Sequence, residues 1–419
     1  MPALFPNVCR FAAAALPFVL IGALTGRASV AQQPSSSPIT IRAARVIDGR
    51  GKVLTNAVVE VQGTKIVRID QRQGPVTHDL GDATLLPGMI DVHTHIDWHF
   101  QPNGLYGRRD GQPAETPEQR DAAIAANLKA TLEAGFTTVQ NVGNGGDKAL
   151  RDAIAAGKLV GPRILTSLGQ VQAGGRGGPA TPDQLRERVR QLKADGADLI
   201  KVFASESIRT GGAPTMSQEQ LDAVCGEANA QGLRTLVHAH AAEAIIRVVK
   251  AGCTQVEHGA YASNEALKMM KDAGTYFDPN IGLVLQNYIE NKAKFLGTGS
   301  YDEAGFAFME KAVGIKGEMF GRALKSGVKM PLGTDAVAGA HGQNAREIIA
   351  RVQEGQSPMD GIISATSLAA ESMRLDKEIG MLAPNFEADI VAVSGNPLQD
   401  ITKLRNVVFV MKGGTVYKK

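Results

Sequence analysis

Residues 86–99 read LPGMIDVHTHIDWH and join an apolar strand to two closely spaced histidines. A Pro-Gly turn leads into the apolar run, which ends in His93 and His95. Because alternate residues of a strand point to the same face, the two imidazoles face the same way. An isolated pair of this kind is often only a hydrogen-bonding pair, so the rest of the chain has to decide its role.

Strands and helices alternate regularly after this stretch. Predicted strands lie at residues 89–95, 136–143, 163–169, 199–203, 235–240, 254–259, 275–280 and 329–335, and helical patterns at residues 116–134, 147–156, 182–194, 217–230 and 242–250. Strands that alternate with helices of this size predict a parallel sheet, and eight such units suggest closure into a barrel. We therefore expect an α/β fold with a (β/α)8 TIM-type barrel over residues 88–384.

The two ends of the mature chain have a different pattern. Residues 39–87 and 385–419 contain short alternating β segments separated by Gly and Asn turns. We expect these two pieces to form one small composite β-sandwich beside the barrel. A polar linker, QQPSSSP at residues 32–38, precedes the first piece.

The first 31 residues resemble an export signal. Residues 11–26, FAAAALPFVLIGALTG, are apolar but too short and too interrupted for a comfortable membrane span. Small residues at Ser29 and Ala31 then offer a cleavage site before Gln32. We expect cleavage there, a periplasmic or secreted location, and no stable membrane span in the mature protein.

Composition limits the partners. The chain has 419 residues, 43% hydrophobic and 21% charged residues, and a formal net charge of +3. This near balance gives no reason to expect a nucleic-acid partner; we expect a small-molecule substrate and a homo-oligomer. Cys225 and Cys253 remain after removal of the signal, and pairing or burial as free thiols are both open.

Metal-binding and acid–base residue types recur at the carboxyl ends of the predicted strands. In order along the chain they are His93, His95, Lys201, His238, His240, His258 and Asp335. Active sites of (β/α)8 barrels lie at this rim. Lys201 is unusual because a buried ammonium is costly to desolvate, so it should be paired, deprotonated or modified.

This order of residues on strands 1, 4, 5, 6 and 8 resembles the amidohydrolase superfamily of metal-dependent hydrolases. The similarity covers nearly all of the mature chain and includes LPGMIDVHTH, VHAHAAEAIIRVVKAGCTQVEHG and LGTDAVAGAHGQNARE. Within the superfamily the chain is most similar to the imidazolonepropionase-like branch, which includes Xaa-Pro dipeptidases and ochratoxin-hydrolysing amidases.

The resemblance implies two divalent metal ions, with zinc expected from the imidazole and oxygen ligands. His93, His95 and Asp335 would bind the more buried ion, and His238 and His258 the second. Lys201 would be N-carboxylated and bridge the two, which would account for its burial. Asp335 would also take a proton from the attacking water and pass it to the leaving amine.

The substrate is less well defined by the sequence. Arg176 and Arg209 lie on predicted strand-end loops and are candidates to bind a substrate carboxylate. His240, Tyr261 and His341 are further candidates for the substrate pocket. We expect cleavage of an amide bond in a dipeptide or N-acyl amino acid. The alternatives are hydrolysis of a cyclic amide or lactone, and a metal- or solute-binding barrel without turnover.

Overall fold

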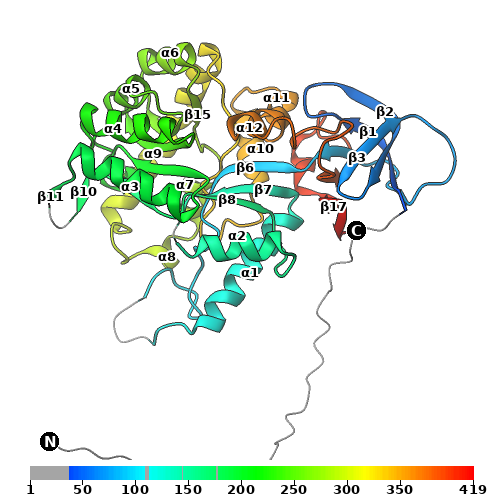
Figure 1. Ribbon diagram of the computed structural model, residues 1–419, viewed down its shortest axis with the longest axis horizontal. Helices are drawn as coiled ribbons and strands as arrows, with labels where there is room; N and C mark the ends of the chain where they lie inside the picture. The colour runs from blue at the N-terminus through cyan, green and yellow to red at the C-terminus, as the bar shows by residue number, and fades with distance from the viewer. Residues whose placement is uncertain (1–36, 109–112, 144, 176–177) are drawn as a thin grey trace, which may run out of the picture. The chain divides into compact units, whose positions relative to one another are not determined.

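The computed structural model of the protein describes residues 37–108, 113–143, 145–175 and 178–419 (Figure 1). The predicted signal peptide and Arg176 lie outside these residues. No helix within the described ranges is long and apolar enough to cross a membrane.

The centre of the fold consists of two parallel sheets. The first has the strand order β6-β7-β8, and the second has the order β15-β14-β13-β12-β9. Their strands are β6 (Met89–Thr94), β7 (Phe136–Asn141), β8 (Arg163–Thr166), β9 (Gln170–Gln172), β12 (Leu199–Phe203), β13 (Arg234–Ala241), β14 (Gln255–Tyr261) and β15 (Tyr276–Asp278). A small hairpin, β10 (Gly174–Gly175) with β11 (Gly178–Pro179), follows β9. The parallel α/β prediction is thus confirmed for all predicted strands except the last.

Residues 329–335, the eighth predicted strand, do not form a regular strand. Pro331 has no N–H to donate to a strand ladder, which interrupts the pattern at its centre. The backbone still lies between the two sheets: the amides of Phe277 in β15 and Val92 in β6 each donate to a carbonyl of this segment at 2.9 Å. The strand prediction was wrong here, although the segment occupies the predicted place.

Helices follow the strands, with bounds within one residue of the predicted ones for α1 to α5. They are α1 (Pro117–Glu133), α2 (Asp147–Ala155), α3 (Pro182–Asp195), α4 (Gln218–Ala230), α5 (Ala242–Lys250), α6 (Asn264–Ala273), α7 (Val284–Glu290), α8 (Lys292–Phe295), α9 (Glu303–Ser326), α10 (Ala345–Gln353), α11 (Pro358–Ser364) and α12 (Ser367–Ser372), with short 3-10 turns η1 (Ile208–Thr210) and η2 (Ile401–Arg405). Capping boxes at Thr116, Thr181 and Ser217 explain why α1, α3 and α4 begin where they do.

Both ends of the chain contribute to one mixed sheet. Its strands are β1 (Ile39–Ile47), β2 (Val53–Gln62), β3 (Lys65–Asp70), β4 (His78–Asp79), β5 (Thr84–Pro87), β16 (Ile390–Val393), β17 (Val407–Lys412) and β18 (Thr415–Lys418). The order is β18-β17-β16-β5-β1-β2-β3, with β4 paired to β1. The blue and red strands in Figure 1 belong to this sheet. All eight strands are linked by hydrogen bonds into this one sheet, so the two ends of the chain build one β-unit, as the sequence predicts.

Successive side chains of these strands pack into two separate hydrophobic clusters. Leu85 and Ile390 belong to a cluster formed by the strands of the mixed sheet, whereas their neighbours Leu86 and Val391 pack with Phe136 of β7. Successive side chains of a strand point to opposite faces, so the same strands close their own core and join the α/β region. Burial on both faces explains why β16 is apolar throughout and why β5 is apolar after Thr84.

A disulfide joins Cys225 in α4 to Cys253, which precedes β14. The two residues are 28 positions apart and their Cα atoms are separated by 5.1 Å. Both side chains are buried. The pairing that the sequence left open is therefore present in the structure.

Candidate functional site

The strand ends carry a histidine-rich cavity of about 110 Å³. Its lining includes every member of the set predicted at the strand ends: His93, His95, Lys201, His238, His240, His258 and Asp335. The histidines and Lys201 lie on or directly after the parallel strands β6, β12, β13 and β14, whose carboxyl ends share one edge, and Asp335 comes from the irregular segment between β15 and β6. The structure therefore brings together residues that are up to 242 positions apart in the sequence.

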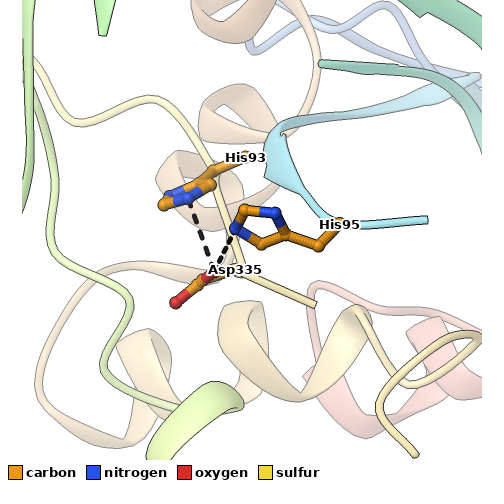
Figure 2. A group of neighbouring side chains, drawn as sticks. All are labelled: His93, His95 and Asp335. Carbon is orange, nitrogen blue, oxygen red and sulfur yellow. Dashed lines mark ion pairs between the residues drawn. The ribbon is translucent and has the colours of Figure 1, made fainter. Parts of the chain in front are cut away.

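His93, His95 and Asp335 form one compact group of side chains (Figure 2). Asp335 Oδ1 lies 3.1 Å from His95 Nε2 and 3.4 Å from His93 Nε2. The Asp335 amide donates to the carbonyl of His93 at 2.7 Å, which ties its loop to β6. One ligand atom from each side chain lies within 4.8 Å of the others, which suits a single cation.

Burial sets the charge state of the site. It lowers the pKa of His93 to about 4 and that of His238 to about 3, so both imidazoles are neutral at pH 7. Burial likewise lowers the pKa of His258 well below its usual value. For Asp335, burial alone would raise the pKa, but the nearby His93 and His95 lower it overall. Neutral imidazoles beside an ionised carboxylate are the protonation states that metal ligation requires.

Lys201 is buried and forms an ion pair with Glu257, a residue to which the sequence analysis assigned no role. The Lys201 ammonium also lies 3.3 Å from His93 Nε2. Strand alternation would point Glu257 away from its neighbour His258, but His258 has φ 70°. This left-handed turn lets both side chains reach the site, and it leaves no sequence pattern by which Glu257 could be recognised.

Glu257, His93 and His258 form a second group whose ligand atoms lie within 4.8 Å of one another. His93 Nδ1 is 3.3 Å from Glu257 Oε1, and neither atom has a hydrogen-bond partner among the described residues. The ring of His238 lies 4.6 Å from that of His258, centroid to centroid. Unpartnered buried nitrogen and oxygen atoms are costly, and a divalent cation would satisfy them. The residues present therefore fit metal ions.

A buried network of charged side chains contacts the Nδ1 atom of His93. Asp278 Oδ2 lies 3.5 Å from His93 Nδ1, and Asp278 Oδ1 lies 3.3 Å from the guanidinium of Arg351. Arg351 Nε also donates to Glu347 at 3.0 Å. Glu347 in turn accepts hydrogen bonds from two backbone amides in the loop before α7. This network connects the imidazole of His93 to the loop that leads into the cavity wall.

The predicted substrate residues have different positions. Arg209 lines the cavity from η1, where its guanidinium lies 4.2 Å from the ring of Tyr301. Tyr261 packs at the edge of an aromatic cluster, and His341 Nε2 lies 3.1 Å from the carbonyl of Trp98; neither is among the cavity-lining residues. The cavity is also lined by Tyr288 and Lys316, which the sequence analysis missed.

Comparisons with known proteins agree with this geometry. The Amidohydrolase family model matches residues 84–417. Ochratoxinase from Aspergillus niger is 26% identical over 438 residues, covering 93% of this chain and 88% of that protein. The crystal structure of a Xaa-Pro dipeptidase with methionine bound in its active site has a TM-score of 0.81 and 30% identity, covering 91% of this chain and 100% of that one. A prolidase complexed with N-methylphosphonate-L-proline has a TM-score of 0.79 and 25% identity, with coverage of 91% and 100%.

The fold, the histidine-rich site and these matches define a hydrolase that acts on C–N bonds. The chain belongs to the amidohydrolase family.

Proposed function

We propose that this protein is an exported, metal-dependent amidohydrolase that cleaves the amide bond of a dipeptide or N-acyl amino acid. The observation that carries the proposal is the convergence of His93, His95 and Asp335 within 4.8 Å on the wall of a cavity. The relatives with bound methionine and with a proline derivative support the substrate class, because both amino acids carry a free carboxylate.

In this proposal His93, His95 and Asp335 would hold one ion, His238 and His258 would hold a second, and Lys201, once N-carboxylated, would add an anionic ligand. Zinc suits this set of nitrogen and oxygen donors. Bound divalent ions supply a hydroxide near neutral pH and polarise the carbonyl of the substrate. Carboxylation would break the Lys201–Glu257 ion pair, because it replaces the ammonium by an anion.

The protein's own groups supply proton transfer and orientation. Asp335 is held in its ionised form, so it can accept a proton from the attacking water and return it to the leaving nitrogen. Arg209 is held by a hydrogen bond from Nε to Ser300 at 3.0 Å, while its two Nη groups have no partner among the described residues. These Nη groups are free to bind a carboxylate. His240 lines the same cavity.

We also propose that the two parallel sheets close into a (β/α)8 barrel. The Asp198 amide donates to the carbonyl of Thr166 at 2.8 Å, which joins β8 to the start of β12. On the other side, residues 329–335 bond to both β15 and β6. These contacts support a closed ring with the site at one end.

Export is part of the proposal. Residues 1–31 have the composition of a cleavable signal. The Cys225–Cys253 disulfide is an independent argument, since disulfides persist mainly in oxidising compartments such as the periplasm or the cell exterior.

The test is metal content and hydrolysis of dipeptides, N-acyl amino acids and lactones by wild type and Asp335→Asn. We expect about two ions per wild-type chain. We expect Asp335→Asn to lower kcat by at least roughly 100-fold, since it removes the proton-transfer group and a proposed ligand. Asp121→Asn, which alters an exposed carboxylate of α1 outside the proposed ligand set, is the control and should leave kcat unchanged. A metal-loaded wild type that hydrolyses none of these substrates would contradict the proposal.

A further inference from the structure

Lys316 is a buried cation on the wall of the cavity. It lies in α9, and its side chain is only 2% exposed. Nζ donates one hydrogen bond, to the carbonyl of Asn280 at 2.6 Å. An ammonium has three N–H donors, so two remain without a partner among the described residues.

The nearby acidic groups do not pair with Lys316. Asp278 and Glu347 both contact Arg351, and Glu347 also accepts from the amides of Ile281 and Gly282. Within the described part of the chain, no carboxylate oxygen lies within 4.0 Å of the Lys316 ammonium. A buried cation without an ion-pair partner is costly, and it would be stabilised by an anion that enters the cavity.

Lys316 shares this part of the cavity with Arg209. The helix α9 packs against η1, which carries Arg209. Both cations are close enough to His240 to contribute to its lowered pKa, after the larger effect of burial. Burial also lowers the pKa of Lys316 to about 8, so the ammonium form prevails at pH 7. Two cations from neighbouring elements therefore face one cavity that also holds the histidine cluster.

We propose that Lys316 binds the free carboxylate of the substrate and restricts the enzyme to amides whose nitrogen belongs to an amino acid with a free carboxyl group. This inference rests on the proposed amide hydrolysis for its functional meaning. Its binding chemistry can be tested separately, because a carboxylate ligand and its neutral carboxamide differ only at this group.

The experiment compares N-methylphosphonate-L-proline with its carboxamide by calorimetry, and alanyl-proline with alanyl-prolinamide by kcat/KM. The variants are Lys316→Met and Lys316→Gln, with Lys325→Met as the control because Lys325 is an exposed lysine of the same helix. Gln can still donate to the carbonyl of Asn280 but carries no charge, so it separates a packing role from carboxylate binding. Melting temperatures identify any variant that is misfolded.

We expect wild type and Lys325→Met to prefer the carboxylate by roughly 10- to 100-fold, the usual effect of hydrogen bonds to a charged group. Both Lys316 variants should lose most of this preference, mainly through Kd and KM, with the remainder supplied by Arg209, and should bind the carboxamide as wild type does. An equal loss for both ligands in Lys316→Gln, an unchanged preference, or no binding of the carboxylate to wild type would overturn the inference. Preferential binding without hydrolysis would instead support Lys316 and contradict the proposed function.

Discussion

Lys201 combines near-complete burial with a positive charge in the middle of a proposed metal site. In the structure its ammonium is neutralised by Glu257. A carboxylated lysine would be an anion and would leave Glu257 without this partner. The unmodified and modified states of Lys201 therefore place different net charges beside His93, and they should differ in their capacity for metal.

This difference predicts that carbon dioxide controls metal loading. Metal-free wild type reconstituted with zinc and bicarbonate should bind about two ions per chain, and about one in buffer depleted of carbon dioxide. Lys201→Met should bind about one ion in either buffer, because it has no amine to carboxylate. Zinc content measured by elemental analysis checks both proteins. Equal loading of wild type in the two buffers would contradict carboxylation.

At the level of single residues, the sequence predicted the seven strand-end residues that line the cavity, but neither Glu257 nor Lys316. The rim histidines could be recognised because each follows an apolar strand. Glu257 directly precedes His258, whose left-handed backbone redirects the imidazole, so simple strand alternation does not predict that both side chains reach the site. Lys316 lies in a long helix that also carries exposed lysines, and only the packing of α9 on the cavity separates it from them.

At the level of the elements, the predicted helices agreed with the structure because their starts carry strong signals. Thr116 and Thr181 are each followed by proline and then by a glutamine that completes the cap. The eighth strand failed because its apolar pattern was correct but Pro331 cannot take part in a ladder. The short strand β9 was also missed, since three residues give too little periodicity to recognise.

The contribution of the disulfide between α4 and the segment before β14 to stability can be measured directly. Closing a loop of 28 residues stabilises a fold by about 3–4 kcal/mol in the chain-entropy model. The double variant Cys225→Ala/Cys253→Ala should therefore have a clearly lower Tm. Wild type in dithiothreitol should melt close to the variant, while the variant itself should not respond to the reductant. A Tm insensitive to both changes would show that the two thiols do not pair in solution.

For the whole molecule, the buried ionisable groups predict that acid weakens the fold. Unfolded histidines have a pKa near 6.5, whereas burial lowers the pKa of His93 to about 4 and of His238 to about 3. His240 and His258 are lowered as well. Between these values and 6.5 the unfolded chain binds more protons than the folded one, so the free energy of unfolding falls as the pH falls.

Three buried carboxyls, Asp91, Asp278 and Asp389, act in the opposite direction, because burial raises the pKa of each. Burial raises the pKa of Asp91 to about 7 and that of Asp278 to about 6, so their folded forms hold protons that the unfolded chain releases. Burial also lowers the pKa of His341 to about 4. Five buried histidines outweigh three carboxyls, and we expect the metal-free protein to melt several degrees lower at pH 5 than at pH 7. The extra stabilisation by zinc should also decrease, because protons compete for its ligands. A higher Tm at pH 5 would contradict this balance.

The mixed sheet has a consequence for the order in which the chain can complete its fold. β5 pairs with β1 on one side and with β16 on the other, so Pro87 finds its partner Ile390 only after some three hundred further residues have been synthesised. Until then one edge of β5 offers unpaired backbone groups, the kind of edge that pairs with other chains. Because contacts of such sequence separation form slowly, the nascent chain stays incomplete until its last strands leave the ribosome. A chain that cannot finish folding early stays unfolded for longer. An unfolded chain is the form that can pass through a narrow membrane pore.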